Sequence, residues 1–249
     1  MDTVAVVILA AGKGKRMNSE TAKVLQSINS KPMIQYVVDA AVGLVGSNVI
    51  VVVGTQADKV RAAVLANHPD VGFAMQEKQY GTGHAVLCAI PELMDNIEHV
   101  LILCGDVPFI KSTTLNNMVN AHIQQENVIT VLGAILKNPT GYGRLVTNEH
   151  QQVLNIVEEA DASTVEKEIK LINTGVYCVN RNLLEIMLGQ IKADNSQNEL
   201  YLTDIVGIAA NNGYKMGMIQ CSNGNEILGI NTPYDLEKAV AVFSAIENP

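Results

Sequence analysis

Short runs of apolar residues recur along the chain, and each run is continuous instead of alternating with polar residues. Most of the runs are rich in valine and isoleucine. This pattern is typical of strands that are buried on both faces, as in a parallel sheet covered by helices. The runs lie at Val4–Leu9, Val49–Val53, Val100–Cys104, Val128–Ile135 and Leu171–Val179, with a weaker one near Lys215–Cys221. We expect each of them to form a strand.

The segments between these runs carry apolar residues at helical spacing. Pro32 stands where the first residue of a helix is expected, and Thr232 stands where a cap would open the last helix. The other expected helices are Ala57–Ala66, Gly83–Leu93 and Ser112–Gln125. Continuous apolar strands that alternate with helices predict a doubly wound α/β fold, in which a mostly parallel sheet carries helices on both faces. No linker or repeat divides the chain, so we expect one domain over residues 1–249.

The composition is that of an ordinary globular protein, with 48% hydrophobic and 17% charged residues. The longest apolar runs, such as Val4–Ala11, are shorter than the roughly 18–20 residues that a membrane-spanning helix requires. An acid, Asp2, stands where a secretory leader would carry basic residues. We therefore expect a cytoplasmic protein that does not bind membranes.

Charge and cysteine content make two further classes of protein poor candidates. The net charge is −8 and no basic stretch follows the opening loop, so nucleic acid is not the expected partner. The cysteines are widely spaced and form no CxxC motif, which argues against a zinc site and against a disulfide framework. They are Cys88, Cys104, Cys178 and Cys221, and we expect most of them to be buried thiols.

The segment LAAGKGKRM at residues 9–17 gathers positive charge directly after the first expected strand. Its glycines allow backbone amides to approach a ligand, and ligands of such sheets bind at the carboxyl ends of the strands. Met17 stands where a P-loop or a dinucleotide fingerprint would need a further glycine, so the segment matches neither motif. We interpret it as an amide cradle with attached cations that suits a triphosphate. The alternative is a tight turn with solvated lysines.

Further motifs follow the opening segment in a fixed order. They are Lys23-Val24-Leu25, QEKQYGTGHA (76–85), GDVP (105–108), TGYGRLV (140–146), IVEEADA (156–162), INTGVY (172–177), YLTDIV (201–206) and GIN (229–231). The ordered set resembles the uridylyltransferase domain of the bacterial N-acetylglucosamine-1-phosphate uridylyltransferases, a family of sugar-nucleotide pyrophosphorylases. The resemblance covers essentially the whole chain.

The resemblance implies a Rossmann-like fold and a Mg²⁺-dependent reaction. UTP and N-acetylglucosamine 1-phosphate would give UDP-N-acetylglucosamine, a cell-wall precursor, and pyrophosphate by in-line attack on the α-phosphorus. Alternatives are the use of glucose 1-phosphate or another hexose 1-phosphate, and a regulatory module that binds nucleotide sugars without turnover. A dehydrogenase is disfavoured by Met17. We expect a monomer or a weak homo-oligomer.

The resemblance also assigns the nucleotide site and the charges around it. Arg16 and Lys23 would be the catalytic cations, and Asp106 and Asn231 would hold the metal. A carboxylate that directly follows a buried strand, as Asp106 does, is costly without a cation or donors, although a helix cap is the alternative role. The nucleotide would be bound by Leu9, Ala10, Ala11, Gly12, Gly14, Gln76, Gly81, Thr82 and Gly105.

For the sugar phosphate, the resemblance implies Gly143, Glu158 and Asn173, with residues 201–204 shaping the pocket. The polar stretches 138–144 and 193–199 are expected to form loops over this sugar-facing part. Four polar residues outside these sets receive no chemical role. We expect the side chains of Lys13, Lys15 and Glu159 to be solvated, and His84 to pack or cap a helix.

Three positions depart from the family pattern: Ala22 replaces a proline, Cys104 an aromatic residue and Thr232 an amide or acid. None removes an expected ligand. We divide the domain into a nucleotide-binding half (about 1–110), a sugar-binding half (about 111–232) and a C-terminal helix (233–249). Bifunctional relatives continue into a left-handed β-helix that transfers acetyl groups, so we expect this chain to hold only the uridylyltransferase part, unless it is a fragment of such a protein.

Overall fold

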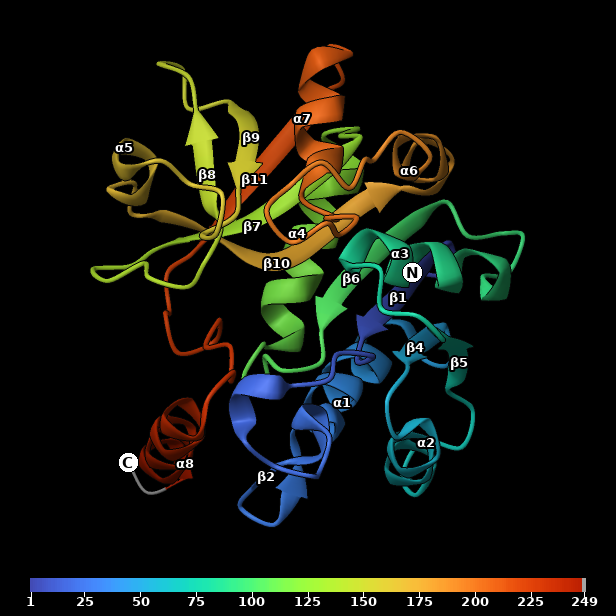
Figure 1. The fold of residues 1–249 in the computed structure, drawn as a ribbon. Coiled ribbons are helices and arrows are strands. Elements are labelled where there is room, and N and C mark those ends of the chain that lie inside the picture. Colours follow the sequence, from blue (N-terminus) through green and yellow to red (C-terminus); the bar gives the residue numbers. More distant parts are fainter. Residues whose placement is uncertain (248–249) are drawn as a thin grey trace.

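The computed structural model describes residues 1–247, and within them a nine-stranded sheet forms the centre of the molecule (Figure 1). The strands along its main path have the order β11-β7-β10-β6-β1-β4-β5, with β8 and β9 attached beside β10. They are β1 (Val4–Leu9), β4 (Val49–Val53), β5 (Gly72–Met75), β6 (His99–Cys104), β7 (Ile129–Ile135), β8 (Arg144–Thr147), β9 (Val153–Val157), β10 (Leu171–Asn180) and β11 (Met216–Cys221). A separate hairpin joins β2 (Ser27–Ile28) to β3 (Lys31–Pro32).

Helices cover both faces of the sheet, as the sequence pattern predicts (Figure 1). One face packs against α1 (Met33–Val45), α2 (Ala57–Leu65) and α4 (Ser112–Gln124), and the other against α3 (Thr82–Ala89), α6 (Arg181–Leu188) and α7 (Asp204–Asn211). Strand β1 shows why one continuous apolar run serves both faces, because alternate side chains point to opposite sides. Val4, Val6 and Ile8 belong to the first core, whereas Ala5 and Val7 belong to the second.

The sheet is mostly parallel, and β10 is the strand that reverses direction. β1 pairs in parallel with β4 and β6, β4 with β5, and β7 with β11. β10 lies antiparallel between β6 and β7. Its first residues therefore lie at the edge where the parallel strands end, and Asn173 is among them. The doubly wound fold is confirmed, with this one reversal on its main path.

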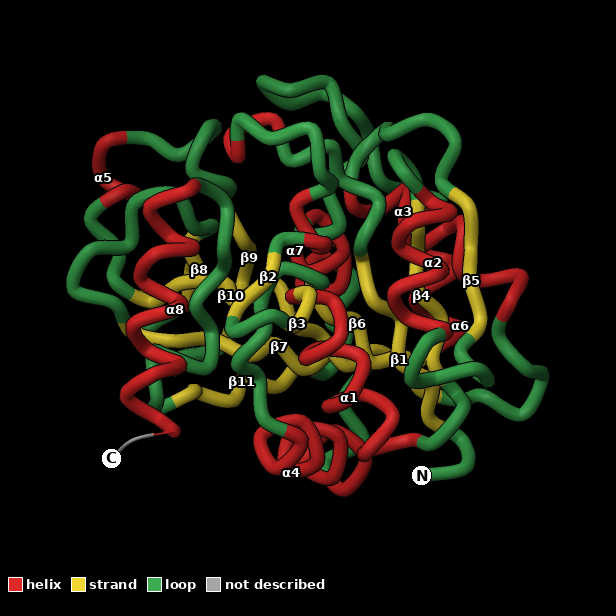
Figure 2. The backbone as a smooth tube through the Cα atoms, turned by 90° about the horizontal axis from the view of Figure 1, so that it is seen from below, coloured by secondary structure: helices red, strands yellow, loops and turns green. Residues whose placement is uncertain are grey.

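The remaining elements complete the lobe beside β10 and the lower end of the molecule. The lobe holds β8, β9 and the short helix α5 (Thr164–Lys167). Helix α8 (Pro233–Glu247) packs on the β2–β3 hairpin side, and both Figure 1 and Figure 2 place it at the opposite end of the molecule from β5. None of the described helices combines the length and the apolar character needed to cross a bilayer.

Three expectations about local structure need correction. Pro32 lies in β3 and caps α1, which begins at Met33, because the hairpin uses the proline as its last residue. Arg144 opens strand β8 instead of closing a loop. Of the four cysteines, Cys178 and Cys221 are buried, but Cys88 and Cys104 are only partly buried, so the expectation that most are buried was wrong. Cys104 is partly open because it stands at a strand end beside a cavity.

Candidate active site

Two cavities open at the carboxyl ends of β1 and β6, and they meet at one wall. These strands lie side by side, with Leu9 opposite Cys104, and β6 flanks β1 on the side away from β4. The chain reverses its winding direction there, which is where open α/β sheets bind ligands. The larger cavity has a volume of about 760 Å³ and the smaller about 370 Å³. Both are lined by Cys104 and Asp106.

The cavities separate the residues expected for the nucleotide from those expected for the sugar phosphate. The larger cavity is lined by eight of the nine nucleotide residues, namely Leu9, Ala10, Ala11, Gly12, Gly14, Gln76, Gly81 and Thr82. The ninth, Gly105, lies between two lining residues and donates its amide to the Leu9 carbonyl at 3.0 Å. The smaller cavity is lined by Gly143, Glu158 and Asn173. The fold thus gathers each expected set around its own opening.

The two expected catalytic cations and the two expected metal ligands converge where the cavities meet. The ammonium of Lys23 contacts the Asp106 carboxylate and donates to Asn231 Oδ1 at 3.0 Å. Arg16 donates to the same oxygen at 3.1 Å. The Ile230 amide donates to the Asp106 carbonyl at 2.9 Å, which ties the segment carrying Asn231 to the end of β6. Asp106 therefore acts as an ion-pair partner, and not as a helix cap.

Gly14 explains part of this arrangement. Its φ angle is +58°, and an added Cβ would lie 2.6 Å from Cβ of Lys23. Only glycine combines that backbone conformation with so close an approach. The glycine thus brings the backbone of Lys23 against the opening loop, from which its ammonium reaches Asp106. Lys13 is exposed, as expected, whereas the side chain of Lys15 lies outside the described part of the chain.

Gln76 is held in the larger cavity by its neighbours. Its Nε2 donates to the Gly81 carbonyl at 3.0 Å and lies 3.0 Å from Nδ1 of His84. The ring of His84 also packs edge-on against Tyr80, with centroids 5.2 Å apart. His84 therefore orients an expected nucleotide ligand, which is more than the packing or capping role expected for it. Gln76 as a whole is only 3% exposed, so the orientation of its side chain is well constrained.

The segment 195–203, which we call the strap, lies against the Gly81 loop. The Leu200 amide donates to the Tyr80 carbonyl at 2.7 Å, and the Leu200 carbonyl accepts from Gly83 at 2.8 Å. The Thr82 hydroxyl accepts from the Leu202 amide at 2.9 Å. Gln197 and Glu199 line the larger cavity. Within 193–199, the Ser196 amide also donates to Asp161 Oδ1 at 2.9 Å, so this loop contacts the sugar-facing part as well as the larger cavity.

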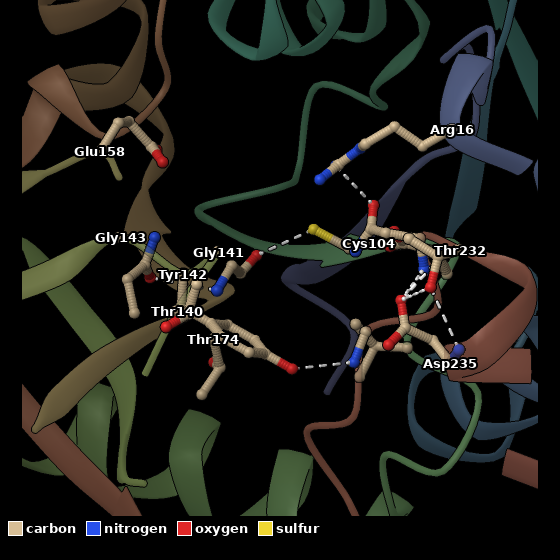
Figure 3. Close-up of a pocket in the computed structure, with 16 residues that line it drawn as sticks. Arg16, Cys104, Thr140, Gly141, Tyr142, Gly143, Glu158, Thr174, Thr232 and Asp235 are labelled. Carbon is tan, nitrogen blue, oxygen red and sulfur yellow. Dashed lines mark hydrogen bonds between the residues drawn. The ribbon is translucent and has the colours of Figure 1, made fainter. Parts of the chain in front are cut away.

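The far end of the strap reaches the smaller cavity. Thr203 donates its hydroxyl to Glu158 Oε1 at 3.2 Å, and burial raises the pKa of that carboxyl. An added Cβ on Gly143 would lie 3.4 Å from Glu158 Oε2 and 3.6 Å from Cβ of Asn173, so the three expected sugar residues are neighbours. Figure 3 shows Glu158 and Arg16 directed into this opening from opposite sides.

Asn173 is fixed by contacts with its own strand and with the Gly143 segment. Its side-chain amide donates to the Tyr177 hydroxyl at 2.6 Å and accepts from the Gly175 amide at 3.1 Å. Its backbone amide donates to the Gly143 carbonyl at 2.8 Å. Burial raises the pKa of Tyr177 well above its ordinary value, so the phenol remains a neutral partner. Tyr177 is a supporting residue that the sequence reasoning did not single out.

An ion pair beneath the smaller cavity was also missed. Arg144, 1% exposed, binds the Glu159 carboxylate at 2.7 Å and donates to the Tyr142 carbonyl. Glu159 is thus not a solvated neighbour of Glu158, because a buried guanidinium requires a counter-charge. The pair connects the residue after Gly143 with the residue after Glu158. The unusual burial of arginine in a strand could not be read from the local pattern TGYGRLV.

The oxygen donors at the meeting point suit a cation. The Asp106 carboxylate and Asn231 Oδ1 both contact one positive charge, the Lys23 ammonium, so their oxygens already converge. Magnesium takes such ligands and completes its shell with water and substrate phosphates. Among the described residues there is no group of three or more histidine, cysteine or acidic side chains that could hold a metal. A magnesium ion here would therefore take further ligands from water and from the substrate phosphates.

Comparison with known proteins identifies the family. The profile described as nucleotidyl transferase matches residues 5–224. The chain belongs to the nucleotidyl transferase family. The match includes every lining residue of the larger cavity and every expected site residue except Asn231. Asn231 lies just beyond it, with three other residues that line the smaller cavity.

Individual nucleotidyl transferase relatives agree with this assignment. The chain is 44% identical over 241 residues to the bifunctional protein GlmU of Brevibacillus brevis, an alignment covering 97% of this chain and 52% of the relative. A GlmU protein of Desulfotalea psychrophila is 42% identical over 236 residues, covering 95% of this chain and 69% of the relative. The chain thus spans about half the length of the first of these relatives.

A solved structure shares the fold of this nucleotidyl transferase. It is a Bacillus anthracis protein assigned as a glucose-1-phosphate thymidylyltransferase, solved in complex with sucrose. The TM-score is 0.76 at 19% sequence identity, and the superposition covers 96% of this chain and 94% of that one. The likeness supports the architecture described above, including the Rossmann-like arrangement of the sheet and its helices.

Proposed function

We propose that the protein is a UTP:N-acetylglucosamine-1-phosphate uridylyltransferase. The observation that carries the proposal is the meeting of two cavities at Asp106, with Lys23, Arg16 and Asn231 in contact around the same point. A reaction between two phosphorylated substrates needs such a place, where both phosphates lie beside concentrated positive charge. The larger cavity would take the nucleotide and the smaller the sugar phosphate.

In the proposed reaction, a phosphate oxygen of the sugar 1-phosphate attacks the α-phosphorus of UTP. The new oxygen–phosphorus bond forms as the bond to the β-phosphate oxygen breaks, and pyrophosphate leaves with that electron pair. The attacking phosphate has a second pKa of about 6, so it is already mostly dianionic at neutral pH and needs no protein base. Positioning and charge neutralisation are the tasks left to the protein.

Arg16 and Lys23 would perform the charge neutralisation. Both are long cationic side chains: Lys23 contacts Asp106 and Asn231, and Arg16 donates to Asn231, where the two cavities meet. Positive groups aimed at the phosphates stabilise the charge that develops on the leaving pyrophosphate more than the charge of the bound substrates. A magnesium ion held by Asp106 and Asn231 would supply further neutralisation of the phosphates.

Recognition of the uracil and of the sugar would use buried polar groups. Gln76, held by Gly81 and His84, keeps its amide oxygen for a pyrimidine edge, which carries donors and acceptors at matching positions. Glu158 and Asn173 bracket the smaller cavity with a carboxylate and an amide, which suit sugar hydroxyls and an acetamido group. Both substrates are cytoplasmic metabolites, so we propose that the protein acts in the cytoplasm. We further propose that it is a monomer or a weak homo-oligomer.

The decisive experiment measures pyrophosphate release with Mg²⁺ across a substrate panel. UTP, CTP, GTP and dTTP are each combined with N-acetylglucosamine 1-phosphate, glucose 1-phosphate and galactose 1-phosphate. We expect the highest kcat/KM for UTP with N-acetylglucosamine 1-phosphate. A preference for another hexose phosphate would overturn the sugar assignment and leave nucleotidyl transfer intact. Nucleotide-sugar binding without pyrophosphate release from any pair would instead favour a regulatory module.

A further inference from the structure

The oxygen atoms proposed to hold the metal are already engaged by a cation of the protein itself. The Lys23 ammonium contacts the Asp106 carboxylate and lies 3.0 Å from Asn231 Oδ1. The Lys23 and Asp106 side chains are each only 16% exposed, so solvent screens this pair weakly. A divalent ion bound to the same two oxygens would sit at about 2.1 Å from each. The ammonium and the ion cannot occupy this position together.

The backbone of Lys23 is held in place, whereas its side chain can turn into the larger cavity. Gly14 packs directly against Cβ of Lys23, and the next residue, Val24, is buried at 4% exposure. Beyond Cβ, the chain of methylenes is flexible and lines the larger cavity, where the nucleotide phosphates would lie. The ammonium can therefore exchange the Asp106 carboxylate for a phosphate without any change in the backbone.

We propose that Lys23 is the resident counter-cation of the Asp106–Asn231 pair and competes with the divalent ion for it. This inference rests on the proposed function for the identity of the metal pair. Its consequence is that the protein without nucleotide binds a divalent ion weakly, because binding must first displace a partly buried ammonium. Nucleotide phosphates remove this competition by giving the ammonium another partner. Lys23 would thus link nucleotide binding to metal binding, in addition to neutralising phosphate charge.

The test is direct Mn²⁺ binding to the whole chain without nucleotide, followed through the electron paramagnetic resonance signal of free Mn²⁺. Lys23→Met removes the charge and keeps much of the side-chain volume, and Lys23→Arg retains the charge. We expect Lys23→Met to lower the Mn²⁺ dissociation constant about tenfold. The reason is that the Lys23 ammonium and the Mn²⁺ ion repel each other strongly at this distance in a partly buried site. Lys23→Arg should bind Mn²⁺ as weakly as the original protein.

Controls separate this inference from the proposed function. Lys13→Met removes an exposed lysine of the same loop and should leave Mn²⁺ affinity unchanged. Asp106→Asn in the Lys23→Met background should abolish the tightened binding. If folded Lys23→Met binds Mn²⁺ no more tightly than the original protein, or if Lys23→Arg binds it equally more tightly, the competition is overturned. The proposed function would still stand in that case if the original protein releases pyrophosphate. Thermal melting of each variant verifies folding, and Lys23→Gln provides a second neutral replacement.

Discussion

Lys23 and Asn231 are separated by 208 positions in the sequence, yet Lys23 Nζ lies 3.0 Å from Asn231 Oδ1 in the structure. At the scale of single residues, the candidate site consists of such long-range contacts around Asp106. Lys23 follows a glycine loop, Asp106 follows β6, and Asn231 precedes α8. Asp235 accepts from both backbone amides of Asn231 and Thr232, which fixes Asn231 at the start of that helix. Lys23, which contacts both Asp106 and Asn231, therefore joins three segments.

Asp106→Ala should abolish Mg²⁺-dependent pyrophosphate release, with a loss of about 100-fold or more in kcat, because the metal pair loses its only carboxylate. The fold should remain largely intact, since Asp106 lies just past a strand end, where it lines both cavities. Pyrophosphate release and thermal melting measure the two effects. Glu20→Ala, at an exposed position of the opening segment, is the matched control. A near-normal rate for Asp106→Ala would remove this residue from the metal site.

Elements far apart in the chain fix the positions of the two cavities relative to each other. The strap runs from the Gly81 loop to Glu158, so a single segment contacts both expected substrate sites. The β8–β9 hairpin carries Gly143 and Glu158 at its open end, and β10 brings Asn173 beside them because it runs antiparallel to its neighbours. Strand direction thus contributes directly to the chemistry of the smaller cavity.

Asn195→Ala should weaken nucleotide binding by loosening the strap. The Asn195 side chain accepts from the amides of Gln197 and Glu199 and donates to the Glu199 carbonyl at 2.6 Å. Loss of these hydrogen bonds should destabilise the ordered conformation of the strap by about 1–2 kcal/mol. We therefore expect the KM for UTP to rise roughly fivefold to tenfold. Steady-state kinetics with each substrate varied in turn measures this. An unchanged KM for UTP would show that the strap does not shape the nucleotide site.

Arg144→Met should act on the sugar phosphate more than on UTP. The variant leaves Glu159 without its buried partner, and the turn that carries Glu158 loses its tie to the Gly143 segment. Partial loss of a buried pair is costly, about 3–5 kcal/mol of stability, so the assay is run well below the melting temperature. We expect the KM for the sugar phosphate to rise about tenfold with little change in the KM for UTP. Arg181→Met, which disrupts a partly exposed pair with Glu185 on α6, is the control.

At the scale of the whole molecule, two apolar cores on opposite faces of one sheet stabilise the protein. At the end of the sheet away from the cavities, polar residues are buried within this frame. His122 is fully buried, with Nδ1 2.9 Å from the Thr130 hydroxyl and Nε2 3.2 Å from Nδ1 of His99. Asn127 also donates to Thr130, at 3.2 Å. Burial and the neighbouring His99 lower the pKa of His122 to about 4.

This buried histidine predicts a loss of stability in acid. His122 is neutral in the folded state down to about pH 4, whereas in the unfolded chain it binds a proton below its ordinary pKa of about 6.5. Stability should therefore decrease as pH falls from about 6.5 towards 4, by up to about 3 kcal/mol. His122→Gln keeps hydrogen-bonding capacity and should flatten this dependence in urea unfolding measured at several pH values. His150→Gln, in an exposed turn, should leave it unchanged.

Much of the framework could be predicted because its elements follow local rules. β1 and β4 were predicted with the bounds they have, and α2 and α4 within one residue of theirs. β5 escaped detection because its four residues, GFAM, lack a continuous branched run. β8 and β9 did so because they are only four and five residues long and include partly or fully exposed positions. Short strands gain their stability from pairing with distant partners, which no local window contains.

The sequence by itself determined the longer strands and helices, the two-faced burial of the sheet, and the motif residues from which a nucleotidyl transferase could be recognised. These follow from hydrophobic periodicity and residue type, which are properties of neighbouring positions. Only the tertiary structure decided which polar residues meet: Lys23 with Asp106, Arg144 with Glu159, and the strap with the Gly81 loop. Such pairs form because burying a charge or a backbone amide demands a partner, and the topology of the chain decides which partner is near.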